Sequence, residues 1–156
     1  MTAQLNPILP ESVKRPRGRP MLPVRGLMSV LDKTYLEVWK LIDNGDLSWV
    51  FDVSLQPGIA RRRELRILAD CAADYAEGRE CALSLDQVFE LLIPHGEPVL
   101  VGDEIEHCLN ISDLHLSNLA ERKLLNRCDR GHRGIGGESK FTRTSFTSFL
   151  TSRRVV

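Results

Sequence analysis

The stretch that decides the fold is residues 34–45, TYLEVWKLIDNG. Thr34 and Glu37 form a capping box, because the threonine hydroxyl can accept the amide of residue 37 while the carboxylate accepts the amide of residue 34. Apolar residues at 38, 41 and 42 make one helical face, and Gly45 supplies the left-handed conformation that ends many helices. The sequence predicts a helix that begins after Thr34 and ends before Gly45.

The flanking segments predict that this helix belongs to a helix-turn-helix with a wing. We expect a shorter helix near residues 24–31, a strand over 49–53 and a turn at 56–58. A returning strand over 63–68 then enters a helix that runs through Tyr75. The strand pair would be the wing.

The same pattern returns 78 residues further along the chain. Helices are therefore predicted at 103–110 and 114–124, with Ser112 as an N-cap, followed by a wing over 126–141 and a closing helix. The matching pairs are Leu22 and Leu100, Leu27 and Ile105, Leu31 and Leu109, Thr34 and Ser112, Leu36 and Leu114, Val38 and Leu116, and Leu41 and Leu119.

These patterns divide the chain into four parts. Residues 1–20 are expected to form a flexible arm, 21–79 and 98–156 two related units, and 80–97 a bridging helix and linker. A second capping box, which Ser84 opens, begins the bridging helix. The predicted fold class is mainly α with small β-hairpin wings, in two tandem winged helix-turn-helix units.

The arm carries a basic motif, because residues 14–20 read KRPRGRP. Its prolines keep the backbone extended, and the glycine between two arginines allows close approach to a surface. The minor groove of A·T-rich DNA is about 6 Å wide or less and strongly negative, so such a segment fits it. We therefore expect Arg15, Arg17, Gly18 and Arg19 to contact DNA.

Two resemblances to known families follow from these residues. The motif at 14–20 resembles the AT-hook of the high-mobility-group A chromatin proteins. The stretch EVWKLIDNGDL at 37–47, with Thr34 before it, resembles the winged-helix domains of phage excisionases and the N-terminal domains of mercury-resistance regulators. This second resemblance covers residues 24–76 well and 100–154 weakly, and it implies a recognition helix followed by a basic wing.

Side chains near the start of a recognition helix reach base edges, and basic wings contact phosphates. Trp39 and Trp49 lie inside apolar patterns, so we expect them to pack and not to stack on bases. The predicted DNA contacts are Lys33, Tyr35, Leu36 and Lys40 in the first helix pair, Arg61, Arg62 and Arg63 on the first wing, His115, Ser117, Asn118 and Arg122 in the second helix pair, and Arg130, Arg133 and Lys140 on the second wing.

The charges are sorted along the chain although the formal net charge is zero. Residues 1–63 carry ten basic and six acidic side chains, a balance of +4. Residues 64–113 carry two basic and twelve acidic side chains, a balance of −10, and residues 114–156 have a balance of +6. Such segregation is typical of a chain that meets DNA at two surfaces separated by an acidic body.

The cysteines and the apolar segments indicate in which cellular compartment the protein is expected. Cys71, Cys81, Cys108 and Cys128 form no C-x-x-C pair, which predicts reduced, mostly buried thiols. No apolar run approaches the ~20 residues that span a bilayer, and none forms a signal peptide before the basic motif. We therefore expect a cytoplasmic, nucleoid-associated protein with no membrane partner.

Neither a metal site, a cofactor nor an enzymatic activity is predicted. His107, Cys108, His115, Cys128 and His132 match no zinc-ligand spacing. The glycines at 131–137 lack the Lys-Ser/Thr ending of a phosphate-binding loop, and the chain has no G-x-S-x-G elbow.

The predicted function is binding of double-stranded DNA, with A·T-rich DNA as the expected partner, in transcription regulation or as an architectural accessory to recombination. The alternative is an adaptor that docks a recombinase or polymerase subunit through its helix-turn-helix units and acidic body. Structured RNA is less favoured, because the few aromatic residues are not interleaved with the basic ones.

Overall fold

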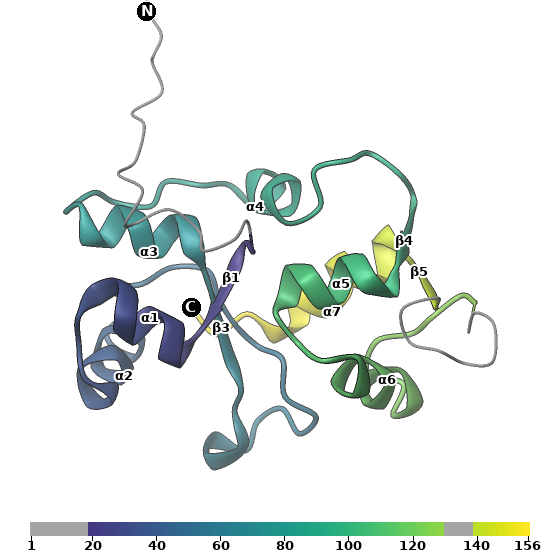
Figure 1. Cartoon of the computed structure of the whole chain (residues 1–156), viewed down its shortest axis with the longest axis horizontal. Helices are drawn as coiled ribbons and strands as arrows, with labels where there is room; N and C mark the ends of the chain where they lie inside the picture. Colours follow the sequence, from purple (N-terminus) through teal and green to yellow (C-terminus); the bar gives the residue numbers. More distant parts are fainter. Residues whose placement is uncertain (1–18, 130–138) are drawn as a thin grey trace, which may run out of the picture.

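Seven α-helices and two small antiparallel sheets make up residues 19–129 and 139–156, the part of the chain that the computed structural model describes (Figure 1). In chain order the elements are β1 (Met21–Pro23), α1 (Val24–Leu31), α2 (Tyr35–Asp43), β2 (Val50–Asp52), the 3-10 helix η3 (Ala60–Arg62), β3 (Leu65–Leu68), α3 (Ala69–Ala76), α4 (Leu85–Leu92), β4 (Val99–Val101), α5 (Gly102–Leu109), α6 (Asp113–Glu121), β5 (Lys140–Thr142) and α7 (Arg143–Arg153).

The fold is mixed helix and sheet, with short strands. One sheet has the order β1-β3-β2, and the other pairs β4 with β5. β2 and β3 form the expected hairpin, in which Val50 faces Ile67. β1 and β4 were not predicted, because three residues are too few to show alternation and Pro23 lies in β1.

The helix predicted after Thr34 is confirmed as α2. The Thr34 amide donates to the Glu37 carboxylate at 2.8 Å, and the Glu37 amide donates to the Thr34 hydroxyl at 3.3 Å. The hydrogen bond from the Thr34 amide lowers the pKa of the Glu37 carboxyl. Gly45 has a φ of 77°, so it supplies the left-handed exit. The capping box at Ser84 is confirmed in the same way at the start of α4.

β1, α1 and α2 recur at a constant spacing as β4, α5 and α6, whereas β2 has no counterpart among the strands that the structure describes. β4, α5 and α6 begin 78 residues after β1, α1 and α2 and match them in length. Leu22 of β1 faces Ile67 of β3, and Leu100 of β4 faces Phe141 of β5. Left-handed residues end α1 and α5, with φ of 53° at Asp32 and 56° at Asn110. The segment between the second helix and the returning strand is shorter in the second copy, because β5 begins only 75 residues after β3 and α7 only 74 residues after α3.

The first sheet contributes side chains to two hydrophobic clusters, and one of these clusters joins the two copies. Leu22, Val50 and Ile67 point from the first sheet toward α1 and α2, where Leu27 and Val38 are buried. The alternate side chains of the same strands, Met21, Phe51 and Leu68, enter a second cluster that contains α4 and the core of the second copy. Successive strand residues face opposite sides, so the first sheet is buried on both faces.

Two arginines for which the sequence indicated no role between the copies connect them. The Arg66 guanidinium on β3 donates to the carbonyls of Leu109 and Asn110, at 3.0 Å each, where α5 ends. Removal from water lowers the pKa of Arg66. Arg153 of α7 donates to the carbonyls of Asp52 at 2.9 Å and Ser54 at 2.8 Å. Both side chains satisfy backbone oxygens at the junction.

A disulfide corrects the expectation of reduced thiols. Cys71 on α3 and Cys81 in the following loop are bonded, with Cα atoms 5.2 Å apart, because the chain reverses direction after α3. Cys108 is a buried thiol as expected, and burial raises its pKa, whereas Cys128 is exposed. Disulfides persist mainly in oxidising compartments, so the cysteines no longer support a cytoplasmic location.

No helix in the described part of the chain has the length and apolar character needed to cross a bilayer.

The disulfide should contribute measurably to stability. Replacing Cys81 with Ser (Cys81→Ser) is expected to lower the free energy of unfolding by about 2–3 kcal/mol, because the bond closes a short loop in the unfolded chain. Urea unfolding without reductant measures this change. Cys128→Ser is the control and should leave the urea midpoint unchanged. If the unaltered protein and both variants had equal midpoints, the Cys71–Cys81 bond would not stabilise the fold.

Arg66 should be needed for docking of the two copies. Arg66→Met removes charged donors from two carbonyls, and it is expected to cost about 2–3 kcal/mol of unfolding free energy. The control is Arg79→Met, because Arg79 makes only surface ion pairs with Asp74 and Glu77 and should change the urea midpoint little. A loss no larger than that of the control would show that Arg66 does not hold the junction.

Candidate nucleic-acid interface

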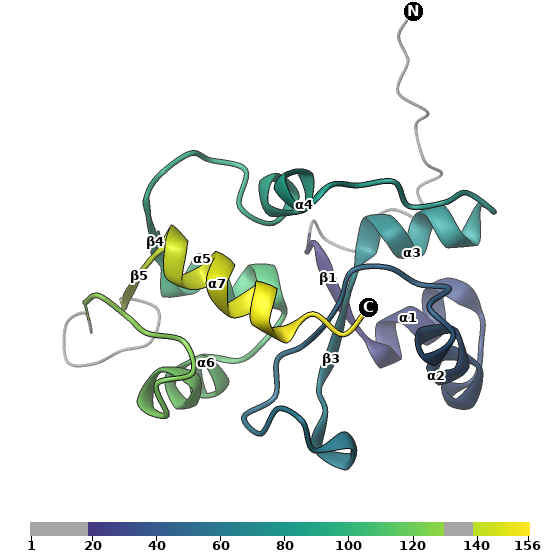
Figure 2. The same cartoon turned by 180° about the vertical axis from the view of Figure 1, so that it is seen from behind.

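α2, the loop of the first wing and α6 lie along one edge of the molecule, at the bottom of Figure 1 and again in the reverse view of Figure 2. We call this the helix–wing edge and define it as α2, residues 53–64 and α6. α3 and α4 lie along the opposite edge in both views. The second helix of each copy is therefore on the same side of the molecule, with the first wing between them.

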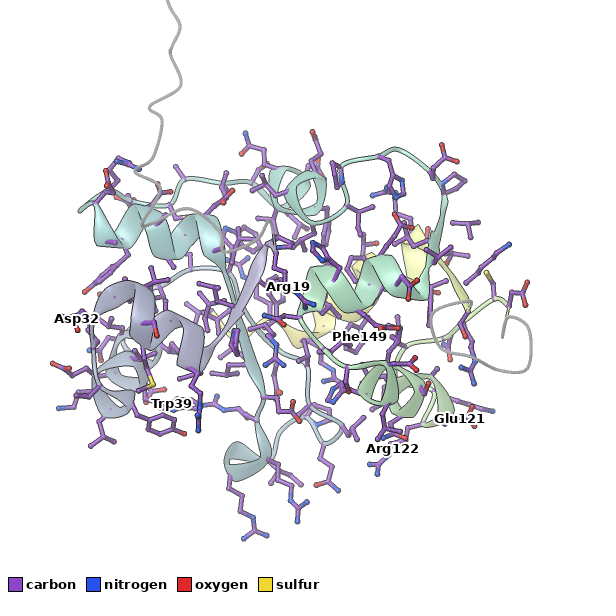
Figure 3. The ribbon with its side chains drawn as sticks, in the orientation of Figure 1. Arg19, Asp32, Trp39, Glu121, Arg122 and Phe149 are labelled. Atoms are coloured by element: carbon purple, nitrogen blue, oxygen red, sulfur yellow. A yellow bond between two sulfur atoms is a disulfide. The ribbon has the colours of Figure 1, made fainter. Side chains whose placement is uncertain are left out.

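Exposed cations gather on the helix–wing edge and at its ends. They are Lys40 on α2, Arg61 and Arg62 on the wing, and Arg122 and Lys123 after α6. Carboxylates lie there too, but two of them are engaged: Glu37 caps α2, and Glu121 is paired with Arg127. Figure 3 shows Arg122 at this edge below the ribbon of α6.

The opposite edge carries the acidic middle of the sequence. The side chains of α3 and α4 and of the loop between them include six carboxylates, at positions 70, 74, 77, 80, 86 and 90. Arg79 is the one cation in this described stretch, and it is paired with Asp74 and Glu77. The acidic and basic segments, which are separate along the sequence, therefore lie at opposite edges of the structure.

Arginines from the two copies meet at one hollow on the helix–wing edge. Arg62 of the wing and Arg122 after α6 both line it, together with Leu55, Gln56 and Glu64. The hollow is open to solvent and polar, which suits a phosphate group more than an apolar ligand. The sequence had assigned both arginines to DNA but gave no sign that they are neighbours.

The start of α2 presents an aromatic and an aliphatic side chain to solvent. Tyr35 is 54% exposed and Leu36 is 71% exposed. The Tyr35 ring packs edge-on against Trp39 with a centroid distance of 5.9 Å, and the Arg63 guanidinium lies 4.9 Å from the Trp39 ring centre. Arg63 therefore joins the wing to α2 by a cation–π contact and is half-buried, unlike Arg61 and Arg62.

The tryptophans pack within the fold, as the sequence predicted. Trp49 is buried, and the Arg154 guanidinium lies 3.6 Å from its ring centre. Trp39 is half-buried between Tyr35 and Arg63. Neither offers an open face for stacking on a base.

His115 lies against the wing and not on the open face of α6. Its Nε2 is 2.7 Å from the carbonyl oxygen of Val53, so this nitrogen must carry the proton and donate. Its Nδ1 is 3.9 Å from the Glu64 carboxylate. Asn118 and Ser117 on the same helix are half-buried. The imidazole thus fixes α6 to the first wing, a role that helix position alone does not reveal.

Arg19 is part of the folded structure. Its Nη1 donates to the side-chain oxygen of Asn110 at 2.8 Å, and the Asn110 amide nitrogen donates to the Met21 carbonyl at 3.3 Å. Figure 3 shows Arg19 at the end of α5, away from the helix–wing edge. Lys140 is exposed on β5, which is also away from that edge (Figure 1). Five predicted contacts lie outside the described residues: Arg15, Arg17, Gly18, Arg130 and Arg133.

Lys33 is half-buried in the turn between α1 and α2, beside the capped start of α2. Within residues 19–129 and 139–156, no group of three or more histidine, cysteine or acidic side chains could hold a metal ion. The arrangement places exposed guanidinium and ammonium groups on the loop at residues 53–64, late in α2 and just after α6, and such groups can bind anions and base edges.

Comparison of the chain with family models, with curated proteins and with solved structures found no match.

Proposed function

We propose that this protein binds double-stranded DNA through the helix–wing edge. The observation that carries the proposal is the duplication of one helix pair, whose second helices, α2 and α6, lie on the same edge with the cations of the first wing between them. In this proposal α2 and α6 are the recognition helices of two winged helix-turn-helix units. The protein would serve transcription regulation or act as an architectural accessory to recombination.

The size and cap structure of the two helices support this role. A helix with its side chains is about 10–12 Å wide, which matches the major groove. Thr34 and Ser112 cap the helix starts, so the first-turn side chains are held in defined directions. Tyr35, Leu36 and Lys40 of α2 are exposed and available to base edges or phosphates.

The wing supplies affinity that does not depend on sequence. Arg61 and Arg62 are exposed, and Arg62 shares its hollow with Arg122, so one stretch of phosphates could contact both copies. Arg63 and His115 act as positioning residues, because their contacts with Trp39 and Val53 set the wing between the two helices. The acidic edge formed by α3 and α4 repels DNA and orients the approach.

The arm extends this proposal to the minor groove. Arg19 is hydrogen-bonded to Asn110, so Arg15, Arg17 and Gly18 remain of the four contacts predicted in the basic motif. Arginines beside a glycine suit the narrow groove of A·T-rich sequences. Contacts in both grooves favour A·T-rich DNA as the partner.

Neutralising the wing should weaken binding to every duplex. The variant Arg61→Ala/Arg62→Ala is expected to lower affinity for mixed-sequence DNA and to reduce the slope of log affinity against log salt by about 2, because each lost phosphate contact removes about one released counterion. Fluorescence anisotropy over a series of salt concentrations measures both quantities. Arg79→Ala on the acidic edge is the control and should bind as the unaltered protein does.

An unaltered chain that fails to bind duplex DNA at low salt would refute the proposed function and would favour the protein-interaction adaptor. If the double variant binds with an unchanged salt slope, the wing is not part of the DNA interface.

The arm should discriminate between sequences. Arg17→Ala is expected to weaken binding to A·T-rich duplexes by about five- to tenfold, a typical value for one lost groove contact, and to affect G·C-rich duplexes less. Competition between the two kinds of duplex measures the difference. An equal loss on both would mean that residues 14–20 act only as a basic tail.

A further inference from the structure

Two leucines on the helix–wing edge are far more exposed than the other large apolar side chains that the structure describes. Leu36 is 71% exposed and Leu114 is 70% exposed, whereas the next aliphatic side chain, Ile59, is 42% exposed. One exposed leucine needs no explanation, because folded proteins expose much apolar surface. The two leucines, however, hold the same position in the two copies.

Each leucine is the second residue of its helix, and the two helix starts have the same backbone conformation. The N-caps Thr34 and Ser112 have φ/ψ of −76°/165° and −80°/162°. Their hydroxyls accept the amides of residues 37 and 115 at 3.3 and 3.0 Å. The Cα–Cβ bonds of Leu36 and Leu114 therefore point in equivalent directions relative to their helices.

The residues next to the two leucines differ between the copies, whereas the leucine itself is the same in both. Position 35 is Tyr and position 113 is Asp, while positions 37 and 115 are Glu and His. Trp39 and Lys40 are replaced by Ser117 and Asn118 in the second copy. Buried positions such as Val38 and Leu116 stay apolar because the core needs them, but neither leucine is in the core. Retention of one exposed side chain among changed neighbours points to a ligand that both copies contact.

We propose that Leu36 and Leu114 each pack against the C5 methyl group of a thymine in the major groove. The inference rests on the proposed function and specifies it: the bound duplex carries a thymine at the equivalent place in each of two half-sites. The thymine methyl is the one apolar group that a base pair presents in that groove, and aliphatic side chains recognise it by contact.

The charges nearby favour DNA over an apolar protein partner. Lys40 is on the same helix as Leu36, and Arg61 and Arg62 of the wing lie on the same edge. A docking site for an apolar peptide is usually depleted of charge at its centre. Leu36 thus shares its edge with Lys40, Arg61 and Arg62, which suits a methyl group set within a polyanion, and Arg122 and Lys123 follow the helix that carries Leu114.

Uracil scanning tests the inference directly. A duplex is selected from a random pool by the full chain, and each thymine is replaced in turn by deoxyuridine, which removes only the C5 methyl. The unaltered protein should lose about three- to fourfold in affinity at one position in each half-site, as expected for one methyl-sized group no longer buried. Leu36→Ala should abolish the uracil effect at one of these positions, and Leu114→Ala at the other.

Leu85→Ala is the matched control. Leu85 is 39% exposed and is the first residue of α4 after its cap Ser84, on the acidic edge. This variant should keep both uracil effects. Thermal unfolding of the three variants should match that of the unaltered protein, because the side chains removed are not in the core.

The outcomes separate this inference from the proposed function. Binding of the selected duplex with no thymine at which uracil matters, or with uracil effects that survive both leucine substitutions, would overturn the thymine contacts and leave DNA binding intact. Enrichment of no duplex by the full chain would overturn the proposed function and the thymine contacts together.

Discussion

Burial of the first sheet on both faces is the constraint on which the rest of the structure depends. β1, β2 and β3 send alternate side chains into two cores, Val50 and Ile67 toward α1 and α2, and Phe51 and Leu68 toward α4 and the second copy. If one face of this sheet were exposed to solvent, the two copies would be joined only by the linker. Because both faces are covered, α2 cannot move relative to α6 without exposing this apolar surface to water. The spacing between the two helices is therefore a property of the core.

Because the junction between the copies is buried, the backbone carbonyls there need hydrogen-bond donors from the protein. The carbonyls at the end of α5 and beside β2 lie where water has limited access, and an unpaired buried carbonyl is costly. Arg66 and Arg153 reach across to satisfy them, each from one copy to the other. His115 does the same for Val53. These contacts couple the wing of the first copy to the helices of the second, so that the surface proposed to meet DNA is assembled from both.

Much of the fold could be predicted from the sequence, because its signals are local. Hydroxyl caps at 34, 84 and 112 and apolar residues at helical spacing locate α2, α4 and α6 closely. The features that escaped prediction depend on contacts between distant residues. The Cys71–Cys81 bond requires a chain reversal that spacing does not show, and β1 and β4 are strands only because β3 and β5 pair with them. For the candidate site, the predicted wing identified Arg62, and the predicted second helix identified Arg122, as surface cations. Neither could show that His115 turns toward Val53 or that Arg63 lies against Trp39.

The two copies differ in charge at the starts of α2 and α6, although the caps of these helices have the same backbone conformation. α2 begins with Tyr35 and carries Lys40, whereas α6 begins with Asp113 and carries Asn118. Burial raises the pKa of Glu106, and the neighbouring carboxylates of Asp113 and Asp103 raise it further, so the start of α6 lies in a negative environment. Such a helix start attracts phosphate less than that of α2. In the proposed complex α2 and the wing would therefore supply most of the affinity, while α6, held in place by the shared core, would contribute mainly to the choice of sequence.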